Sequence, residues 1–193
     1  MTAEYQLSLT PRTLENADPE QKAILEQAKA QLGFVPNMYA GMVNSPGLLK
    51  TYLAGYEQFR QNTGFSPIEQ EVIFLTISRE NGCSYCMAAH SVIADTASKV
   101  PAEVTAALRE GRDIPDPQWA ALSTFTRTLV AQRGKPSVAA VDAFLSAGYT
   151  ETQVLEIILA IAVKTLSNYS NHLLHTSVDE AFAGRTWQSG VEN

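Results

Sequence analysis

Apolar and polar positions show no sustained alternation anywhere in this chain, although a half-buried β-strand requires that pattern. The apolar segments are instead bounded by residues that typically start or stop α-helices. The longest apolar run covers 154–163, contains Glu156 and is too short to span a bilayer. The pattern therefore predicts an all-α protein.

The starts of these helices are marked by first-turn prolines and by capping boxes. Asp18-Pro19, Ser45-Pro46 and Asp116-Pro117 place a cap residue before proline. Capping boxes stand at 66–69 and 150–153. The predicted helices lie within 18–33, 45–61, 66–82, 83–97, 101–109, 116–134 and 137–147, and from 150 through the apolar run, with a loop or short helix over 34–44 and a loose tail over 184–193.

Length and charge limit the class of protein. The chain has 193 residues, of which 45% are hydrophobic, so we expect a single domain over 1–193. Its net charge of -6 argues against binding to nucleic acid or to an anionic membrane. The N-terminal stretch MTAEYQLSLTPRT lacks the pattern of a signal peptide, so we expect a cytoplasmic protein, in which a permanent disulfide is uncommon.

The only two cysteines lie in the stretch ENGCSYCMAAHS. Cys83, Cys86 and His90 have the spacing i, i+3 and i+7, which places them on one face of a helix. The start of a helix favours a thiolate, and His90 lies one turn from Cys86, close enough to accept its proton. Glu71 lies on the preceding helix and reaches His90 if the turn at 81–82 makes the two helices antiparallel. The stretch therefore predicts a Glu–His–Cys relay beside a second cysteine.

Other interpretations of these four side chains remain open. The cysteines are an inert buried pair in one of them, and in another the two thiolates, the imidazole and the carboxylate bind zinc. An all-cysteine zinc site is excluded by the count, and structural zinc cysteines usually sit in tight knuckles rather than on a helix. Three functions follow: a thiol peroxidase or disulfide reductase, a non-enzymatic helical module that binds zinc or a partner, and a lyase that uses His90 and Glu71 as acid and base.

The spacing Glu71-x11-Cys83-x2-Cys86-x3-His90 resembles the active-site motif of the AhpD-like alkylhydroperoxidases, in the carboxymuconolactone decarboxylase superfamily. The stretch GFVPN at 33–37 and the stretch SNYSNHLLHTSVDEAF near the C-terminus resemble its peroxidase-related branch. The resemblance implies an all-helical bundle that assembles as a homo-oligomer, a trimer or hexamer. It also implies a hydroperoxide substrate and an external dithiol reductant, lipoyl- or thioredoxin-like, with no cofactor and no metal.

The resemblance further assigns roles to the two cysteines. The residue matching Cys86 attacks the peroxide, and the residue matching Cys83 resolves it by forming a redox disulfide. Tyr85 departs from the founding members, which carry a second histidine there, so we expect its hydroxyl to hold a water instead. The decarboxylase branch lacks the cysteine pair, which argues against lactone decarboxylation.

A second copy of the spacing occurs later in the chain, without sulfur. Glu156, Asn168, Asn171 and His175 each lie 85 positions after their counterparts in the cysteine motif. A long period of this kind predicts two duplicated helical halves, over about 18–100 and 101–183. Asparagine cannot form a disulfide, so we expect one redox site and a degenerate structural copy in which these four side chains form a buried polar cluster. Near Cys86, we expect the carboxylate to favour a protonated imidazole and a thiolate–imidazolium pair.

Overall fold

The computed structural model describes residues 4–188, and within them it contains helices and no strand, which confirms the predicted all-α fold. No helix in this part of the chain is long and apolar enough to cross a bilayer. The elements in chain order are α1 (Pro19–Leu32), α2 (Asn37–Met42), α3 (Pro46–Asn62), α4 (Pro67–Glu80), α5 (Ser84–Thr96), α6 (Ala102–Glu110), α7 (Pro117–Ala131), α8 (Val138–Ser146), α9 (Glu151–Leu174) and the 3₁₀ helix η1 (Glu180–Arg185).

The cap residues account for where the helices begin. Ser66 and Thr150 form the two predicted capping boxes, each accepting a hydrogen bond from the backbone of the third helical residue. Asp18 forms a third box with Gln21, and Gly33 ends α1 in the left-handed conformation at φ 83°. The signals in the sequence therefore locate the helix ends to within a few residues, and the ambiguous segment 34–44 forms α2.

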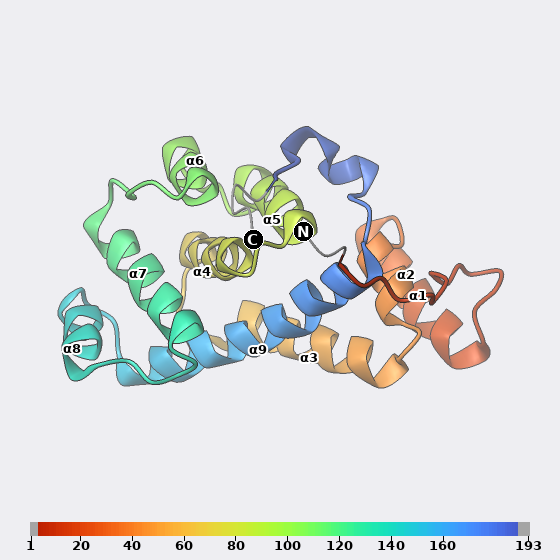
Figure 1. Cartoon of the computed structure of the whole chain (residues 1–193), viewed down its shortest axis with the longest axis horizontal. Helices are drawn as coiled ribbons and strands as arrows, with labels where there is room; N and C mark the ends of the chain where they lie inside the picture. The colour runs from red at the N-terminus through yellow and green to blue at the C-terminus, as the bar shows by residue number, and fades with distance from the viewer. Residues whose placement is uncertain (1–3, 189–193) are drawn as a thin grey trace.

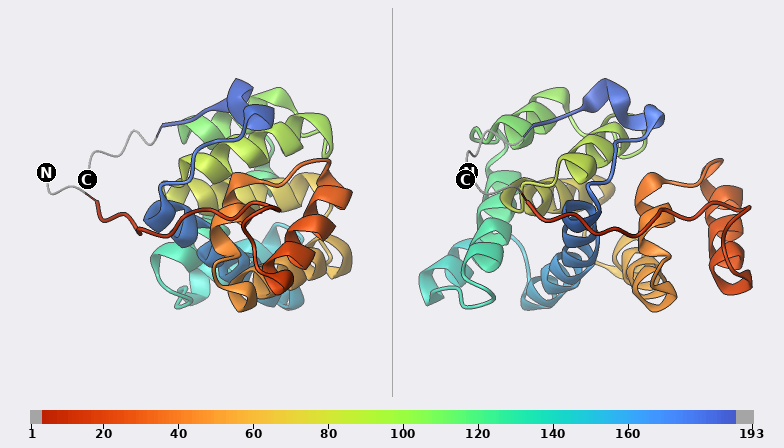
Figure 2. Two further views of the ribbon diagram at one scale, coloured as in Figure 1. Left: turned by 90° about the vertical axis from the view of Figure 1, so that its right-hand side faces the viewer. Right: turned by 45° about the vertical axis from the view of Figure 1, so that its right-hand side comes forward.

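The central helix of the fold is α4, whose residues 70–78 are all buried. It packs against α5, α6, α7 and α9, as Figure 1 shows at the centre of the molecule. The long helix α9 lies alongside α3, whereas α8 packs against α7 and α1 against α3 (Figures 1 and 2). Between α3 and α4, the rings of Phe59 and Phe74 pack with centroids 4.7 Å apart. This arrangement puts one face of α9 beside the junction of α4 and α5.

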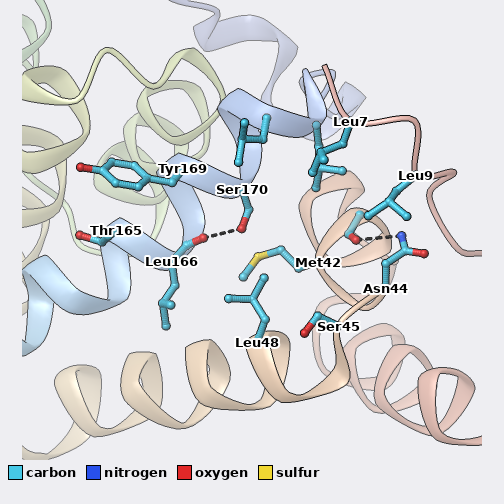
Figure 3. A pocket seen from close by; sticks show the side chains of 13 residues that line it. Leu7, Leu9, Met42, Asn44, Ser45, Leu48, Thr165, Leu166, Tyr169 and Ser170 are labelled. Atoms are coloured by element: carbon cyan, nitrogen blue, oxygen red, sulfur yellow. Dashed lines mark hydrogen bonds between the residues drawn. The ribbon is translucent and has the colours of Figure 1, made fainter. Parts of the chain in front are cut away.

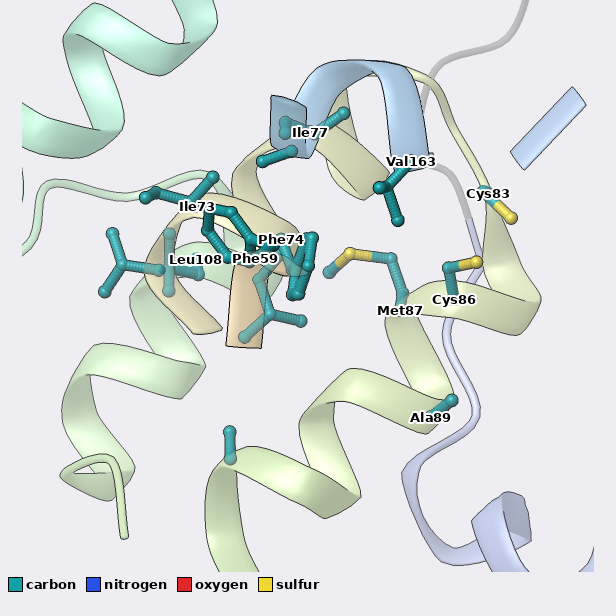
Figure 4. Packing of buried hydrophobic residues seen from close by; sticks show 14 of the residues in the cluster. Phe59, Ile73, Phe74, Ile77, Cys83, Cys86, Met87, Ala89, Leu108 and Val163 are labelled. Atoms are coloured by element: carbon teal, nitrogen blue, oxygen red, sulfur yellow. The ribbon is translucent and has the colours of Figure 1, made fainter. Parts of the chain in front are cut away.

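The junction of α4 and α5 is a tight turn at Gly82, which adopts φ 68°. The backbone N–H of Cys83 donates to the carbonyl of Ser78 at 2.9 Å, which ends α4 and redirects the chain. Cys83 is the cap residue of α5, and Cys86 lies in its first turn. Figure 4 shows both sulfur atoms at this end of α5, next to the apolar cluster that contains Met87 and Val163.

The predicted loose tail is wrong for residues 185–187, which form hydrogen bonds with α6. The indole N–H of Trp187 donates to the carbonyl of Arg109 at 2.9 Å. In return, the guanidinium of Arg109 donates to the carbonyls of Arg185 at 3.1 Å and Thr186 at 2.8 Å. These reciprocal bonds hold the segment after η1, while residues 189–193 of the predicted tail lie outside the described residues.

The contact between α3 and α9 leaves no room for a side chain at Gly55. A Cβ at this position would lie 2.9 Å from Cγ2 of Val163, the neighbour of Lys164. Gly55→Ala is therefore expected to lower the free energy of unfolding by about 1–3 kcal/mol, because overpacking outweighs the better helix propensity of alanine. Urea denaturation measures the change.

Gly47→Ala is the matched control in the same helix, because a Cβ there would meet nothing within 4 Å. This variant is expected to raise the free energy of unfolding by on the order of 0.5 kcal/mol. Equal effects of the two substitutions would contradict the described packing of α3 on α9.

Candidate active site

The turn at Gly82 brings Glu71 and His90 together, as the spacing predicted. Oε2 of Glu71 lies 2.9 Å from Nδ1 of His90, and both side chains are buried. A carboxylate beside Nδ1 fixes the proton on that nitrogen and leaves Nε2 with a free electron pair. His90 is therefore oriented as a hydrogen-bond acceptor toward the interior of the site.

Sequence reasoning missed Arg60, which holds the other oxygen of the same carboxylate. Its guanidinium donates to Oε1 of Glu71 and, at 2.8 Å, to the hydroxyl of Tyr56. Burial raises the pKa of Glu71, but His90 and Arg60 together lower it by more than burial raises it. The pKa of Glu71 therefore lies below its ordinary value. Glu71 is therefore ionised at neutral pH, and no spacing within one helix could have indicated this partner on α3.

The two cysteines are free thiols, and both are buried. Nδ2 of Asn171 lies 3.4 Å from Sγ of Cys86 and 3.7 Å from Sγ of Cys83. Oγ of Ser167 lies 3.9 Å from Sγ of Cys86. A polar face of α9 therefore contacts both sulfur atoms.

The same face of α9 carries a buried lysine. Lys164, Ser167 and Asn171 have the spacing i, i+3 and i+7, the same spacing as the two cysteines and His90 on α5. Lys164 is 1% exposed, and its Nζ lies 5.4 Å from the ring centroid of Phe74. Its position directly after the longest apolar run, 154–163, was the one signal in the sequence that could have indicated a buried lysine.

The environment of the two thiols differs in its effect on their acidity. Burial raises the pKa of Cys86, but a hydrogen bond from Cys83, the charge of Lys164 and, when its ring is protonated, the charge of His90 outweigh burial. The pKa of Cys86 therefore lies well below the ordinary value. The pKa of Cys83 is raised, mainly by its hydrogen bond with Cys86 and secondly by burial. The thiolate is therefore at Cys86, and the shared proton stays on Cys83.

His90 is neutral rather than protonated, which corrects the expected thiolate–imidazolium pair. Burial lowers the pKa of His90, and the positive charge of Lys164 lowers it further. Glu71 acts in the opposite direction but does not compensate for these two effects. From the sequence, Glu71 was the only charge expected near the ring, because Lys164 lies on a helix distant in the chain. The predicted protonation state was therefore wrong.

The hydroxyl of Tyr85, which we expected to hold a water, donates a hydrogen bond to a protein side chain. It donates to Oδ2 of Asp179, and the other oxygen of that carboxylate accepts the backbone N–H of Asn37 at 3.1 Å. Burial, together with this hydrogen bond, raises the pKa of Tyr85, so the phenol stays protonated. Tyr85 therefore joins α5 to the segment before η1 and to the start of α2.

The predicted polar cluster of the second copy does not form. Because α9 continues without a break, Glu156 and His175 lie about 28 Å apart at 1.5 Å per residue. Glu156 is only partly buried and accepts the backbone N–H of Gly64 at 2.9 Å, whereas His175 is an exposed C-cap residue. Asn168 and Asn171 are buried against the α4–α5 junction and the cysteines, so they belong to the first site.

A cavity of about 200 Å³ opens beside Cys86 and His90. Its walls come from the end of α1, the loop that follows it, α2, α3, α5 and η1, and they are almost entirely aromatic or aliphatic. The aromatic residues that line it are Phe34, Tyr39, Tyr52, Tyr56, Tyr85 and Phe182. Such walls favour an uncharged organic ligand over an ionic one.

Two further observations concern other possible sites. Within residues 4–188, no three His, Cys, Asp or Glu side chains converge in a group that could hold a metal ion. A second cavity, of about 330 Å³, lies between the N-terminal segment, α2, α3 and α9 (Figure 3). Leu7, Met42 and Leu48 line this second cavity, which contains neither cysteine nor His90.

Comparisons with known proteins find one family and several structures that share the fold. Residues 46–127, from the start of α3 to α7, match the carboxymuconolactone decarboxylase family. None of the curated proteins matches the sequence. The match contains all four residues of the cysteine motif and Arg60.

Solved structures with the same fold cover nearly the whole chain. A peroxidase-related protein with an alkylhydroperoxidase AhpD core from Ralstonia eutropha JMP134 is 22% identical at a TM-score of 0.79, over 93% of this chain and 97% of that one. A peroxidase-related protein from Silicibacter sp. TM1040 is 21% identical at a TM-score of 0.77, with the same coverage. A variant of the debrominase Bmp8 in complex with 2,3,4-tribromopyrrole is 18% identical at a TM-score of 0.75, over 95% and 97% of the two chains.

The opposite pKa directions of the two thiols predict unequal labelling of the reduced protein. At pH 6 an ordinary thiol with a pKa of about 8.5 is almost fully protonated, whereas Cys86 keeps a larger thiolate fraction. Iodoacetamide is expected to modify Cys86 at least about tenfold faster than Cys83, because only the thiolate reacts. Tandem mass spectrometry of the peptide that contains both cysteines locates the label.

Cys83→Ser and Cys86→Ser, each labelled alone, serve as controls for accessibility, and the urea-unfolded protein sets the rate of unperturbed thiols. Faster labelling of Cys83 in the folded wild-type protein would reverse the assignment of the thiolate.

Proposed function

We propose that this chain, whose residues 46–127 match the carboxymuconolactone decarboxylase family and whose fold is that of peroxidase-related proteins, is a thiol-dependent oxidoreductase that reduces an organic hydroperoxide. One observation carries the proposal. The thiol with the lowered pKa, Cys86, lines an apolar cavity, and Cys83 is hydrogen-bonded to it from the preceding turn. An activated sulfur beside a resolving sulfur is the arrangement that two-step peroxide reduction requires.

In the first step, Sγ of the Cys86 thiolate bonds to the distal oxygen of the hydroperoxide as the O–O bond breaks. Cys86 becomes a sulfenic acid, and the organic fragment leaves as an alkoxide that takes a proton from solvent. That proton replaces the one released when Cys86 ionised. The hydroperoxide is thereby reduced by two electrons to an alcohol, and the sulfur is oxidised by two.

In the second step, Sγ of Cys83 attacks the sulfenic sulfur of Cys86. The S–S bond forms as the S–O bond breaks, and the thiol proton of Cys83 leaves with the hydroxide as water. An external dithiol then exchanges with the disulfide, becomes oxidised itself and restores both cysteines. The chain needs no cofactor for this cycle.

His90 orients the substrate in this scheme. Its Nδ1–H is held by Glu71, so the free electron pair on Nε2 accepts the O–H of the hydroperoxide in the cavity. Arg60 keeps Glu71 ionised, and Glu71 in turn keeps the imidazole in this one tautomer. Glu71 and Arg60 are therefore positioning residues, and His90 contacts the substrate.

The lining of the cavity supports a hydrophobic substrate. Six aromatic side chains surround the open space, and the carboxylate of Asp179 nearby is already engaged by Tyr85. A hydroperoxide with an alkyl or aryl group gains from burial against these walls, whereas hydrogen peroxide gains nothing from them.

The aromatic lining also favours a second candidate, the reductive dehalogenation of an aromatic ring. The debrominase Bmp8 shares the fold and binds a tribromopyrrole. In such a reaction the two thiols supply two electrons, the carbon–bromine bond is replaced by carbon–hydrogen, and bromide, one proton and a disulfide are formed. A lyase using His90 and Glu71 would need neither thiol.

The reduced protein is expected to lose both thiols on addition of one equivalent of cumene hydroperoxide, with formation of cumyl alcohol. Cys83→Ser should stop at a sulfenic acid that dimedone traps, and Cys86→Ser should consume no hydroperoxide. Glu71→Gln is expected to slow consumption by about ten- to a thousandfold, because the tautomer of His90 is no longer fixed. Thiol counting and product chromatography measure these outcomes.

Glu156→Gln is the matched control, because Glu156 is equivalent in the sequence repeat but lies away from the cysteines and keeps an oxygen for the N–H of Gly64. The Glu156→Gln variant should consume cumene hydroperoxide at a rate close to that of the wild type. Retention of both thiols in the presence of hydroperoxide, or release of bromide from a bromopyrrole without any reaction of hydroperoxides, would overturn the proposal.

A further inference from the structure

The side chain of Lys164 is a buried cation near the cysteines that has no role in the proposed reaction. Its Nζ is fully buried and forms no hydrogen bond within residues 4–188. The nearby ring of Phe74, 5.4 Å away, offers only a weak cation–π contact. A buried ammonium without a counter-charge is strongly unfavourable, so a stable fold requires an anion close to it.

The buried carboxylates of the described chain are already engaged by other groups. Glu71 is held by Arg60 and His90, and Asp179 by Tyr85 and the backbone of Asn37. Neither carboxylate contacts Lys164. The remaining group that can carry a negative charge on this side of α9 is a cysteine thiolate.

We propose that Lys164 is the counter-ion of the Cys86 thiolate and that this pair sets both the reactivity of Cys86 and the stability of its disulfide. This inference rests on the proposed thiol chemistry and identifies a positioning residue for it. The geometry behind it is the matched i, i+3, i+7 spacing on α5 and α9. Ser167 and Asn171 contact Sγ of Cys86, and the buried Lys164 lies one turn before Ser167 on the same stripe of α9. The lowered pKa of Cys86, to which the charge of Lys164 contributes, agrees with it.

Charge balance in the buried site leads to the same assignment. Arg60 and Glu71 cancel each other, and Lys164 and the thiolate cancel each other, provided that His90 is neutral. A proton on His90 would add an uncompensated positive charge to a buried site. The other titratable groups that face Cys86 are Cys83, Tyr85 and His90 on α5, Tyr39 on α2, and Tyr52 and Tyr56 on α3. Burial raises the pKa of each of these tyrosines, so they stay neutral and supply no phenolate that could replace the thiolate as the counter-charge of Lys164.

The pair has a consequence for the redox cycle. Formation of the disulfide removes the thiolate and leaves the ammonium of Lys164 without its counter-charge. Lys164 therefore stabilises the reduced form over the disulfide, which favours rapid reduction by the external dithiol. The same charge promotes ionisation of Cys86 in the reduced protein, so one residue acts on both halves of the cycle.

Lys164→Met tests the assignment, because methionine keeps an unbranched chain and removes the charge. In the reduced protein, the rate of Cys86 alkylation at pH 6 is expected to fall at least about tenfold, because only the thiolate reacts and less of it is present without Lys164. The rate should recover at pH 9, where the thiol ionises without that help. In equilibrium with dithiothreitol, the disulfide of the variant should be favoured at least about tenfold more than that of the wild type.

Lys50→Met is the charge-matched control, because Lys50 is exposed and pairs with Glu20 at the surface. It should change neither the pH profile nor the equilibrium with dithiothreitol. Lys164→Gln repeats the test with a neutral polar side chain if the methionine variant does not fold, with circular dichroism as the check. A purely structural role for Lys164 would lower the melting temperature without moving the pH profile.

The pH profile is independent of any peroxide, so the two proposals fail separately. If the alkylation profile of Lys164→Met matches that of the wild type, the counter-ion assignment is wrong, even if hydroperoxide is still reduced. If the profile shifts as expected but the wild type consumes no hydroperoxide, the assignment stands and the proposed function falls.

Discussion

A fully buried carboxylate, that of Glu71, is the group on which the rest of the site depends. Its two oxygens bind Arg60 from α3 and His90 from α5, so one side chain of the central helix joins three helices. Removing one partner of a buried charge typically costs about 3–5 kcal/mol, because the remaining charge loses its compensation. The position of His90 is therefore tied to the integrity of the core rather than to a loop that moves independently.

The same requirement for charge compensation extends to the sulfur atoms. The turn at Gly82 folds α5 back on α4 and sets the cysteines at the start of α5, while the unbroken α9, which carries Lys164, packs against both helices. The two helix stripes with equal spacing then face each other, one carrying sulfur and imidazole and the other carrying ammonium, hydroxyl and amide. The aromatic cavity next to Cys86 excludes ions, so the charges within the site act on each other through a medium of low polarity.

The sequence predicted what is encoded locally. Capping boxes predicted the first residues of α4 and α9. The spacing from Glu71 to His90 across Gly82 predicted the contact between these two side chains. Contacts between helices that are distant in the chain have no such signature, which is why Arg60 and Lys164 were missed. The repeat of the motif was correct as a sequence pattern but misleading as geometry. The second copy lacks the turn after its glutamate, so a single helix separates Glu156 from His175. The predicted protonation state of His90 was wrong for the same reason. Besides burial, the charge of Lys164, which is distant in the chain, lowers the pKa of His90.

The central claim is that a thiolate at Cys86 coexists with a neutral His90. Nitrogen-15 NMR of the histidine rings in the reduced protein at pH 7, with His90→Gln to assign the signal, tests it most directly. The account predicts that His90 shows the chemical shifts of a neutral ring protonated at Nδ1, in a sample whose absorbance at 240 nm reports one thiolate. The contradictory result is an imidazolium signal from His90 that becomes neutral when Cys86 is replaced by serine, because the thiolate would then be balanced by His90 and not by Lys164.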